Sequence, residues 1–357
     1  MRILYFSTVN WKWIKQRPHF IAHYLSLKGY EVDYFSLNPI GKTKIRKFTQ
    51  GRLRVRDTYV IPFALKYRFV EALNAFGLRA KLSFENYHII IVTHPFHLKY
   101  IPARLLVNCL LIYECMDNMP YFYEGPLRER ILAEERKTLN CVDTVITSSN
   151  HLRIALHDRS PDKQMHIETI PNALDRPTFR REPKRLILQE PNLIYIGTIS
   201  DWMDMETIRK FASIHLRYTI YLIGPAEIPL DLLPNMVWLG VKKHDEIIDY
   251  IYSGNIMLLP FLINELTEAV DPVKIYEYLS LKKPVISSYW AELGKFEDAK
   301  IKFYCNYQDF ENRVFEIEQA GFASELDSEF VELNNWEVRV ERYAKLLYSD
   351  LKAKKTN

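Results

Sequence analysis

The segment Asp271–Ser287, DPVKIYEYLSLKKPVIS, places residues that could hold a nucleotide on one predicted helix. Asp271 is typical of a helix N-cap and Pro272 of a first helical residue, and the helix is predicted to run to about Lys282–Lys283. The start of such a helix offers unpaired amides and a positive dipole end to a phosphate. Glu277, one and a half turns further on, could accept two hydrogen bonds from a vicinal diol such as a ribose.

A simpler interpretation of the same residues stays open. Lys274 and Glu277 are three apart and could form a solvated ion pair worth about 0.2–0.5 kcal/mol. Asp271, as a cap, could itself occupy the amides that a phosphate would need. The spacing alone does not decide between an ion pair and a binding site.

Three further polar residues stand where predicted strands end or helices begin. Arg17 lies in a Gln-Arg-Pro-His run that starts a helix, and its guanidinium could neutralise a phosphate. His94 and Asp117 each follow an apolar run, and ligands of open α/β sheets bind beyond the carboxyl ends of strands. The alternatives are that Arg17 and His19 are surface residues on a helix start and that each histidine is hydrogen-bonded and structural.

Strands and helices are predicted to alternate along almost the whole chain, with continuous apolar runs between helices. The predicted strands are 3–7, 31–37, 88–94, 110–116 and 144–149, followed by 192–200, 218–225, 236–240, 254–261, 284–288 and 301–305. Such runs are typical of parallel sheets covered on both faces. We therefore expect an α/β protein with two doubly wound, Rossmann-like domains facing a cleft, and a boundary within 170–185, which is rich in Pro, Asn and Arg.

Several classes of protein are not favoured by the sequence. The loop Thr8–Leu25 has no glycine, which argues against a dinucleotide site, and no P-loop motif occurs. The four cysteines lack zinc-site spacing, so we expect free thiols in a reducing cytosol. An apolar run already begins at residue 2, and no stretch has the length of a spanning helix, so we expect neither a signal peptide nor a membrane span.

Positive charge is concentrated in one region. The 357 residues carry a net charge of +4, but Lys42–Lys81 holds eleven basic and two acidic residues and is +9 by itself. Such asymmetry indicates a basic face for an anionic partner. The residues that we assign to this acceptor or membrane face are Arg52, Arg54, Arg56, Lys66 and Arg68.

A second pattern overlaps this basic region. Apolar residues recur at helical spacing, flanked by cations, and they are Leu65, Phe69, Leu73, Phe76 and Ala80. A basic amphipathic helix can lie in an anionic membrane surface, at about 1 kcal/mol per nearby cation. The stripe could equally pack on the first sheet and leave a solvated basic face. No nucleic-acid motif accompanies the charge, so we expect no nucleic-acid partner.

Taken together, these motifs resemble glycosyltransferase family 4, of the GT-B architecture, and in particular the bacterial cell-surface polysaccharide enzymes of the teichuronic-acid type. The segments that carry the resemblance are Gln16–His19, Cys115–Asn118, the PNALDRPTF run at 171–179, the GTISDWMD run at 197–204 and the DPVKIYEYLSLKKPV run at 271–285. The resemblance implies a donor-binding role for Gly197, Thr198, Pro272, Val273, Lys274 and Glu277, and a catalytic role for Asp117 and Arg17. His94 is added as a catalytic candidate because it stands at the end of a predicted strand.

The sequence departs from the family pattern at several positions. Ala269 stands where the first glutamate of a Glu-x7-Glu motif is expected, and Lys282 stands where a glycine is usual. Thr198 replaces the arginine that normally follows Gly197, and Glu114 replaces the first aspartate before Asp117. These departures remove a carboxylate and a cation that commonly hold the donor.

The resemblance implies a glycosyltransferase that moves a sugar from a nucleoside-diphosphate sugar to a glycan or lipid-linked acceptor, with retention and without a metal or other cofactor. It implies an acceptor-side domain at 1–172, a donor-binding domain at 173–335, and a last helix within 336–357 that crosses back onto the first domain. The expected location is the cytoplasm, with peripheral attachment to the inner face of the cytoplasmic membrane as an option. The alternatives are a catalytically silent scaffold, a membrane-surface binding module and a nicotinamide-dependent enzyme.

Overall fold

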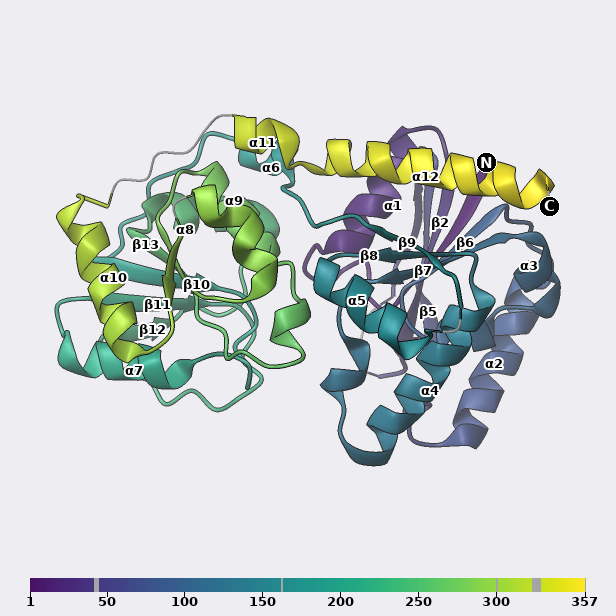
Figure 1. Ribbon diagram of the computed structural model, residues 1–357, viewed down its shortest axis with the longest axis horizontal. Coiled ribbons are helices and arrows are strands. Elements are labelled where there is room, and N and C mark those ends of the chain that lie inside the picture. Colours follow the sequence, from purple (N-terminus) through teal and green to yellow (C-terminus); the bar gives the residue numbers. More distant parts are fainter. Residues whose placement is uncertain (42–44, 162, 300, 323–328, 357) are drawn as a thin grey trace. The chain divides into compact units, whose positions relative to one another are not determined.

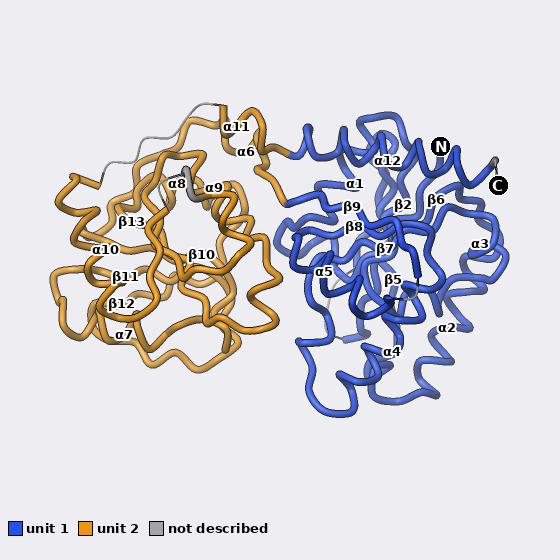
Figure 2. Tube along the Cα trace, viewed as in Figure 1, with its two compact units in different colours: residues 1–171, 336–357 blue, residues 172–335 orange. Residues whose placement is uncertain are grey.

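The computed structural model describes residues 1–41, 45–161, 163–299, 301–322 and 329–356, so Lys42, Lys44 and Asn357 lie outside the described residues. The chain divides into two compact units (Figure 2). Unit 1 contains Met1–Pro171 with Trp336–Asn357, and unit 2 contains Asn172–Asn335. This division lies one residue from the boundary that the sequence predicts.

Unit 1 is built on a mostly parallel sheet in the order β3-β4-β2-β1-β6-β7-β8-β9, with β5 paired to β2. Its strands are β1 (Arg2–Ser7), β2 (Glu31–Pro39), β3 (Lys47–Gln50), β4 (Leu53–Arg56), β5 (Thr58–Val60), β6 (Ile89–Val92), β7 (Leu110–Cys115), β8 (Thr144–Thr147) and β9 (His166–Thr169). The central strands are apolar on both faces because helices cover both sides of the sheet.

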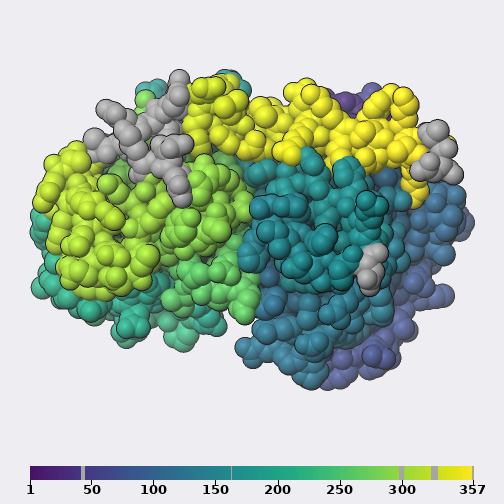
Figure 3. All heavy atoms as spheres, viewed as in Figure 1, coloured from purple at the N-terminus to yellow at the C-terminus, as the bar shows by residue number. Residues whose placement is uncertain are grey.

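The helices of unit 1 include one from the far end of the chain. They are α1 (Arg17–Leu27), α2 (Arg68–Leu82), α3 (Ala103–Asn108), α4 (Gly125–Cys141), α5 (Asn150–Arg159) and α12 (Trp336–Thr356), with short 3₁₀ helices at His97–Tyr100 and Met119–Phe122. α12 lies along α1 (Figure 1), and its residues are seen at the surface of unit 1 (Figure 3). Trp336 anchors it, since its ring is fully buried and stacks on Phe20 with the ring centroids 5.2 Å apart.

Unit 2 is a parallel sheet in the order β12-β11-β10-β13-β14-β15. Its strands are β10 (Asn192–Ile196), β11 (Thr219–Ile223), β12 (Met236–Trp238), β13 (Ile256–Leu259), β14 (Val285–Ser288) and β15 (Lys302–Tyr304). Its helices are α6 (Arg176–Phe179), α7 (Met205–Ile214), α8 (His244–Ser253), α9 (Val273–Ser280), α10 (Tyr307–Gln319) and α11 (Glu329–Leu333), with 3₁₀ helices at Thr267–Ala269 and Ala291–Ala299. Two apolar cores are packed within this unit.

The structure corrects the predicted course of the helix that follows Asp271. α9 begins at Val273 with Pro272 as its N-cap, and it ends at Ser280 rather than at Lys282–Lys283. Lys282 has φ 53°, and the Lys283 amide bonds the Tyr278 carbonyl at 3.1 Å, which closes the helix end. The family's usual glycine therefore corresponds to a left-handed position, which lysine occupies here at some conformational cost.

Candidate functional site

In unit 2, the predicted donor residues gather where the strand order reverses. β10 is flanked by β11 on one side and β13 on the other, and such a switch point is where open α/β sheets bind ligands. Gly197 and Thr198 follow β10, while α9 follows β13 along the chain. The Ile196 amide donates to the Tyr278 hydroxyl at 3.2 Å, so the end of β10 is tied directly to α9.

Two glycines allow the strand ends to approach closely at this edge. A Cβ at Gly224, which has φ 142°, would overlap the carbonyl oxygen of Gly197. A Cβ at Gly197 would lie 2.7 Å from the hydroxyl oxygen of Tyr195. A side chain at Gly197 would therefore displace the buried Tyr195 ring. We did not predict the role of Gly224, although a glycine within a predicted strand, here 218–225, is a usable signal of close backbone approach.

The start of α9 is open, because Asp271 does not cap it. No side chain caps the helix, and the first two amides, of Val273 and Lys274, have no hydrogen-bond partner within the described parts of the chain. The Asp271 carboxylate instead accepts from the Lys295 ammonium at 2.7 Å and from the Asn172 amide at 2.5 Å. The prediction that Asp271 would cap the helix was wrong, and the amides are available to an anion.

Lys274 and Glu277 form the ion pair that their spacing allows, with 2.6 Å between Nζ and Oε2. The pair is not the solvated one of the simpler interpretation, because Glu277 is only 1% exposed. Its Oε1 has no hydrogen-bond partner among the residues that the structure describes. α9 thus presents a cation and one available carboxylate oxygen next to its open end.

Ala269 stands at one departure from the family pattern, and Met203–Asp204 stand at another, near the position where the family usually has a lysine. Ala269 is fully buried in the 3₁₀ helix before α9, where a carboxylate would need a buried partner. Asp204, near the position of the usual lysine, caps α7 by accepting from the Thr207 amide at 3.0 Å. Neither residue supplies charge for a ligand.

In unit 1, Arg17 is buried rather than exposed at its helix start. Its Nε donates to Glu114 Oε1 at 2.7 Å, and both side chains are almost fully buried. Glu114 also accepts from the hydroxyls of Tyr5 and Tyr343. The surface interpretation of Arg17 was wrong, and the charge that we expected to meet a phosphate is already balanced by Glu114.

The predicted histidines are also buried, and burial lowers the pKa of His94 and of His19 to about 4. Both are therefore neutral near pH 7. His94 follows β6, and its Nδ1 accepts from the Phe96 amide at 3.2 Å. His19 Nδ1 accepts from the Gln16 amide at 3.0 Å, which makes it part of the start of α1 rather than a surface residue. His94 can take part in neutral hydrogen bonding but not as a cation.

Asp117 is an acid of unit 1 that the described residues leave without a hydrogen-bond partner. It follows β7 and is partly exposed. Burial raises its pKa from 3.8 to about 6, and the positive charge of Arg17 opposes that rise. A carboxyl group with a shifted pKa and no protein partner, at the carboxyl end of a strand, is a candidate for contact with substrate.

Two of the five residues of the predicted basic face are neutralised by acids of unit 1. Arg54 pairs with Asp33 at 2.6 Å and Arg56 with Glu85 at 2.6 Å, so these arginines hold the sheet edge together. Arg52 is exposed and donates to the Gly29 carbonyl at 3.0 Å. Arg54 and Arg56 therefore offer less free positive charge to an anionic partner than the sequence indicated. Lys66 and Arg68, in contrast, are exposed next to α2.

Metal ligands do not cluster in the described residues: no group of three or more His, Cys, Asp or Glu side chains there could hold an ion. The same residues include no helix that is long and apolar enough to cross a bilayer. The four cysteines are unbridged, and Cys109 and Cys115 are buried.

Replacing Asp117 by Asn should stabilise the protein, and more so at high pH. The folded pKa of about 6 lies above the ordinary 3.8, so the neutral acid is favoured by folding and stability falls as pH rises from about 4 to 6. Above pH 6 the buried charge costs at most about 3 kcal/mol, which Asn does not incur. We expect Asp117→Asn to raise the melting temperature at pH 8 and to have little effect at pH 4.5.

The exposed Asp201 provides the control for this measurement. The melting temperature of Asp201→Asn should equal that of the wild type at both pH values. Equal melting temperatures for Asp117→Asn and wild type at pH 8 would mean that the Asp117 carboxylate is well solvated.

Part of the chain matches a known family. Residues 19–176 match the family model described as Glycosyltransferase Family 4. TuaH of Bacillus subtilis (strain 168), provisionally named a teichuronic acid biosynthesis glycosyltransferase, is 24% identical over 216 residues. The match covers 54% of this chain and spans about half of that relative, 54% of its length.

Solved structures match over nearly the whole chain. Sucrose-phosphate synthase from Thermosynechococcus elongatus has a TM-score of 0.78 at 16% identity and covers 99% of both chains. HepE from Anabaena, in complex with UDP and glucose, has a TM-score of 0.65 at 14% identity and covers 97% of this chain and 99% of its own. An E. coli trehalose-6-phosphate structure bound with UDP-2-fluoro glucose has a TM-score of 0.70 at 11% identity, with 97% and 99% covered. The predicted GT-B fold is confirmed.

Proposed function

We propose that this chain, a family 4-like glycosyltransferase of the GT-B fold, transfers a sugar from a nucleoside-diphosphate sugar held by unit 2. The observation that carries the proposal is the start of α9, where open amides, Lys274 and the buried Glu277 lie within two helical turns. Amides and ammonium suit a diphosphate, and the available Glu277 oxygen suits a ribose hydroxyl. The complexes of HepE with UDP and glucose support this donor class.

The reaction that we propose is transfer with retention, as the family resemblance implies. The bond between the anomeric carbon and the diphosphate oxygen breaks, and the acceptor oxygen forms its bond on the same face of the sugar. The acceptor proton passes to the leaving diphosphate. Lys274 and the α9 amides stabilise the charge that develops on that group, without a resident metal. Asp117 is proposed to contact the donor sugar or the acceptor hydroxyl.

The acceptor that we propose is a glycan or lipid-linked glycan of surface polysaccharide synthesis. The name of TuaH, which assigns that protein to teichuronic acid biosynthesis, supports this class. We place the protein in the cytoplasm, at the inner face of the membrane where lipid-linked acceptors are available.

The donor site can be tested by thermal shift with UDP, GDP, ADP, CMP and NAD on wild type and Glu277→Ala. A ligand at about 100 times its dissociation constant adds roughly 2.7 kcal/mol to the free energy of unfolding. For a protein of this size, that raises the melting temperature by several degrees. We expect one nucleoside diphosphate to raise the melting temperature of the wild type, and Glu277→Ala to lose that shift.

The exposed Glu206 on α7 is the matched control, and Glu206→Ala should keep the full shift. If no diphosphate shifted the wild type, the chain would be a silent scaffold. A shift with NAD alone would overturn the proposal in favour of a nicotinamide-dependent protein.

A further inference from the structure

The loop Thr8–Gln16 begins at the point of unit 1 where the strand order reverses. β1 lies between β2 and β6, so the carboxyl end of β1 is a switch point of the kind at which open α/β sheets bind ligands. The Thr8 amide donates to Thr93 Oγ1 at 3.3 Å, which ties the loop to the end of β6. The loop therefore shares its sheet edge with His94 and Asp117, which follow β6 and β7.

Asn10 fixes the turn of this loop. Its Oδ1 accepts from the Lys12 amide at 2.7 Å, and its carbonyl accepts from the Trp13 amide at 3.0 Å. The same carbonyl lies 3.1 Å from His19 Nε2. Because His19 Nδ1 accepts from the Gln16 amide, the proton of this neutral imidazole is on Nε2 and is donated to Asn10. The turn is therefore held both by its own asparagine and by the start of α1.

The two tryptophans of the loop have opposite surroundings. Trp11 packs edge-on against His19 and Tyr34, with the ring centroids 5.0 and 4.8 Å apart. Trp13, two residues further on, is 54% exposed. It makes no side-chain hydrogen bond, ring stacking or cation–π contact with any residue that the structure describes. Trp11 thus anchors the loop, and Trp13 leaves a flat aromatic face in solvent.

The charge of the loop is positive. It holds Lys12 and Lys15 and no acid. Lys12 is exposed and forms no ion pair within the described parts of the chain. Lys15 is exposed as well, and its Nζ lies 5.8 Å from the centroid of the Phe20 ring. A single exposed apolar side chain is ordinary, but Trp13 is next to an unbalanced cation, on a fixed turn at a ligand-binding edge.

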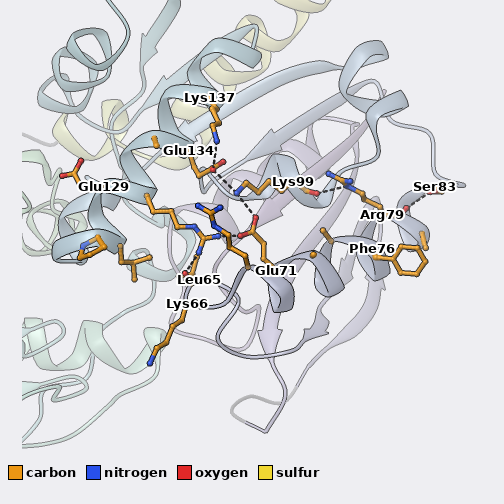
Figure 4. Close-up of a pocket in the computed structure, with 18 residues that line it drawn as sticks. Leu65, Lys66, Glu71, Phe76, Arg79, Ser83, Lys99, Glu129, Glu134 and Lys137 are labelled. Atoms are coloured by element: carbon orange, nitrogen blue, oxygen red, sulfur yellow. Dashed lines mark hydrogen bonds and ion pairs between the residues drawn. The ribbon is translucent and has the colours of Figure 1, made fainter.

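The groove between α2 and α4 offers less free charge to an anion. Its volume is about 1570 Å³. Among its lining residues, Lys99 pairs with Glu71 at 2.7 Å and with Glu134 at 3.0 Å (Figure 4). Glu134 also pairs with Lys137 at 2.9 Å. These charges are largely balanced, whereas Lys12 has no such partner among the described residues, so the loop suits an anionic ligand better than the groove does.

We propose that Trp13 stacks on a sugar ring of the acceptor and that Lys12 pairs with a negative group on that sugar, so that the acceptor is an acidic glycan. The axial C–H bonds of a pyranose form an apolar face, which suits the electron-rich face of an aromatic ring. An ammonium on the same turn suits a carboxylate or a phosphate. The inference rests on the proposed glycosyl transfer and names the chemical class of its acceptor.

Isothermal titration calorimetry of the full chain with matched sugars tests the proposal. The galacturonate trisaccharide carries carboxylates, and maltotriose is an uncharged trisaccharide of similar size. We expect wild type to bind the galacturonate trisaccharide about tenfold more tightly than maltotriose, and added salt to reduce that difference. Glucose 6-phosphate, compared with glucose, distinguishes a phosphate from a carboxylate as the recognised anion.

Variants separate stacking from charge. Trp13→Ala should lose about tenfold or more in affinity for both trisaccharides, whereas Trp13→Phe keeps an aromatic face and should lose less. Lys12→Gln should weaken binding of the galacturonate trisaccharide and leave binding of maltotriose unchanged. Phe84→Ala and Arg153→Gln are the matched controls, since they change an exposed aromatic residue and an exposed cation elsewhere in unit 1. Both should bind as wild type does.

The donor site provides an independent measurement. Trp13→Ala should keep the nucleotide-induced thermal shift, because Trp13 is not among the proposed donor residues. A wild type that shows this shift but does not bind acidic sugars would contradict the acceptor inference alone. A wild type without the shift would contradict the proposed donor site instead.

Three outcomes would overturn the inference. One is a wild type that binds neither the galacturonate trisaccharide nor glucose 6-phosphate more tightly than the uncharged sugars. Another is Trp13→Ala that binds both trisaccharides as Phe84→Ala does. The third is Lys12→Gln that weakens both trisaccharides equally, since Lys12 would then not act through the sugar's charge. Preference for glucose 6-phosphate alone would support the inference and identify the anion as a phosphate.

Discussion

Replacing Glu114 by Ala should destabilise unit 1 by about 3–5 kcal/mol, because it leaves the buried Arg17 guanidinium without its counter-ion. Arg17 and Glu114 side chains are 4% and 0% exposed, so water cannot replace the lost carboxylate. The Tyr5 and Tyr343 hydroxyls would lose their acceptor at the same time. Since whole domains are stable by only 5–15 kcal/mol, the melting temperature should fall by roughly 10 °C.

Burial, followed by the negative charge of Glu114, raises the pKa of Tyr5 and of Tyr343 well above the ordinary 10.0. Both phenols therefore stay protonated and donate to Glu114 over the whole working pH range. Because Tyr343 belongs to α12, the same carboxylate holds the C-terminal helix on unit 1. Hydrogen exchange of Glu114→Ala should therefore show faster opening of α12 together with α1.

The double variant Arg17→Met/Glu114→Leu separates the ion pair from packing. Removal of both charges should recover most of the lost stability, because no uncompensated charge remains buried. If the double variant were as unstable as Glu114→Ala, the loss of stability would come from altered side-chain packing rather than from an unpaired charge. Wild-type stability of Glu114→Ala itself would contradict the buried ion pair altogether.

The alternation of strands and helices could be predicted because buried parallel strands are continuous apolar runs. Runs such as Ile89–Val92 and Leu193–Ile196 are buried along their whole length. Their residues do not alternate between polar and apolar, so the pattern of a half-exposed strand is absent from them. β3 and β4 could not be predicted in the same way. Their residues alternate polar and apolar at a sheet edge, so the segment appeared only as a basic stretch.

The partners of the site residues could not be predicted, since they are distant in sequence. Glu114 lies 97 residues from Arg17 and 229 from Tyr343, and nothing local to each residue indicates the contact. The acids that neutralise Arg54 and Arg56 come from β2 and from the segment before β6. A charge count along one segment therefore overestimated the free positive charge.

α2 shows a different limit of sequence patterns. Its stripe of Phe69, Leu73 and Phe76 was recognised correctly, but Val70 and Leu78 form a second apolar face of comparable quality. Periodicity identifies both faces and does not rank them. In the folded protein, the face of α2 with the smaller side chains packs on unit 1, and the face with the aromatic side chains is exposed to solvent.

Replacing Asp271 by Ala should destabilise unit 2 by about 3 kcal/mol and weaken the donor site. The Asp271 side chain is fully buried, and besides Asn172 and Lys295 it accepts from the Tyr276 hydroxyl at 3.2 Å. Asn172 Nδ2 also donates to the Asp271 carbonyl at 2.6 Å. Asp271 joins the first residue of unit 2 to the start of α9. Without Asp271, the amides proposed to hold a diphosphate should no longer be held in a fixed position.

Lys295→Met and Asp201→Ala calibrate the effect of Asp271→Ala. The Lys295 side chain is 30% exposed, and its removal leaves Asp271 bonded to Asn172 and Tyr276, so we expect a smaller loss than with Asp271→Ala. Asp201 is exposed, and its replacement should change stability by no more than about 0.5 kcal/mol. The measurements are melting temperature and hydrogen exchange of the α9 amides. If Asp271→Ala behaved as Asp201→Ala does, the buried carboxylate would not position the helix, and the open end of α9 would depend on the sheet alone.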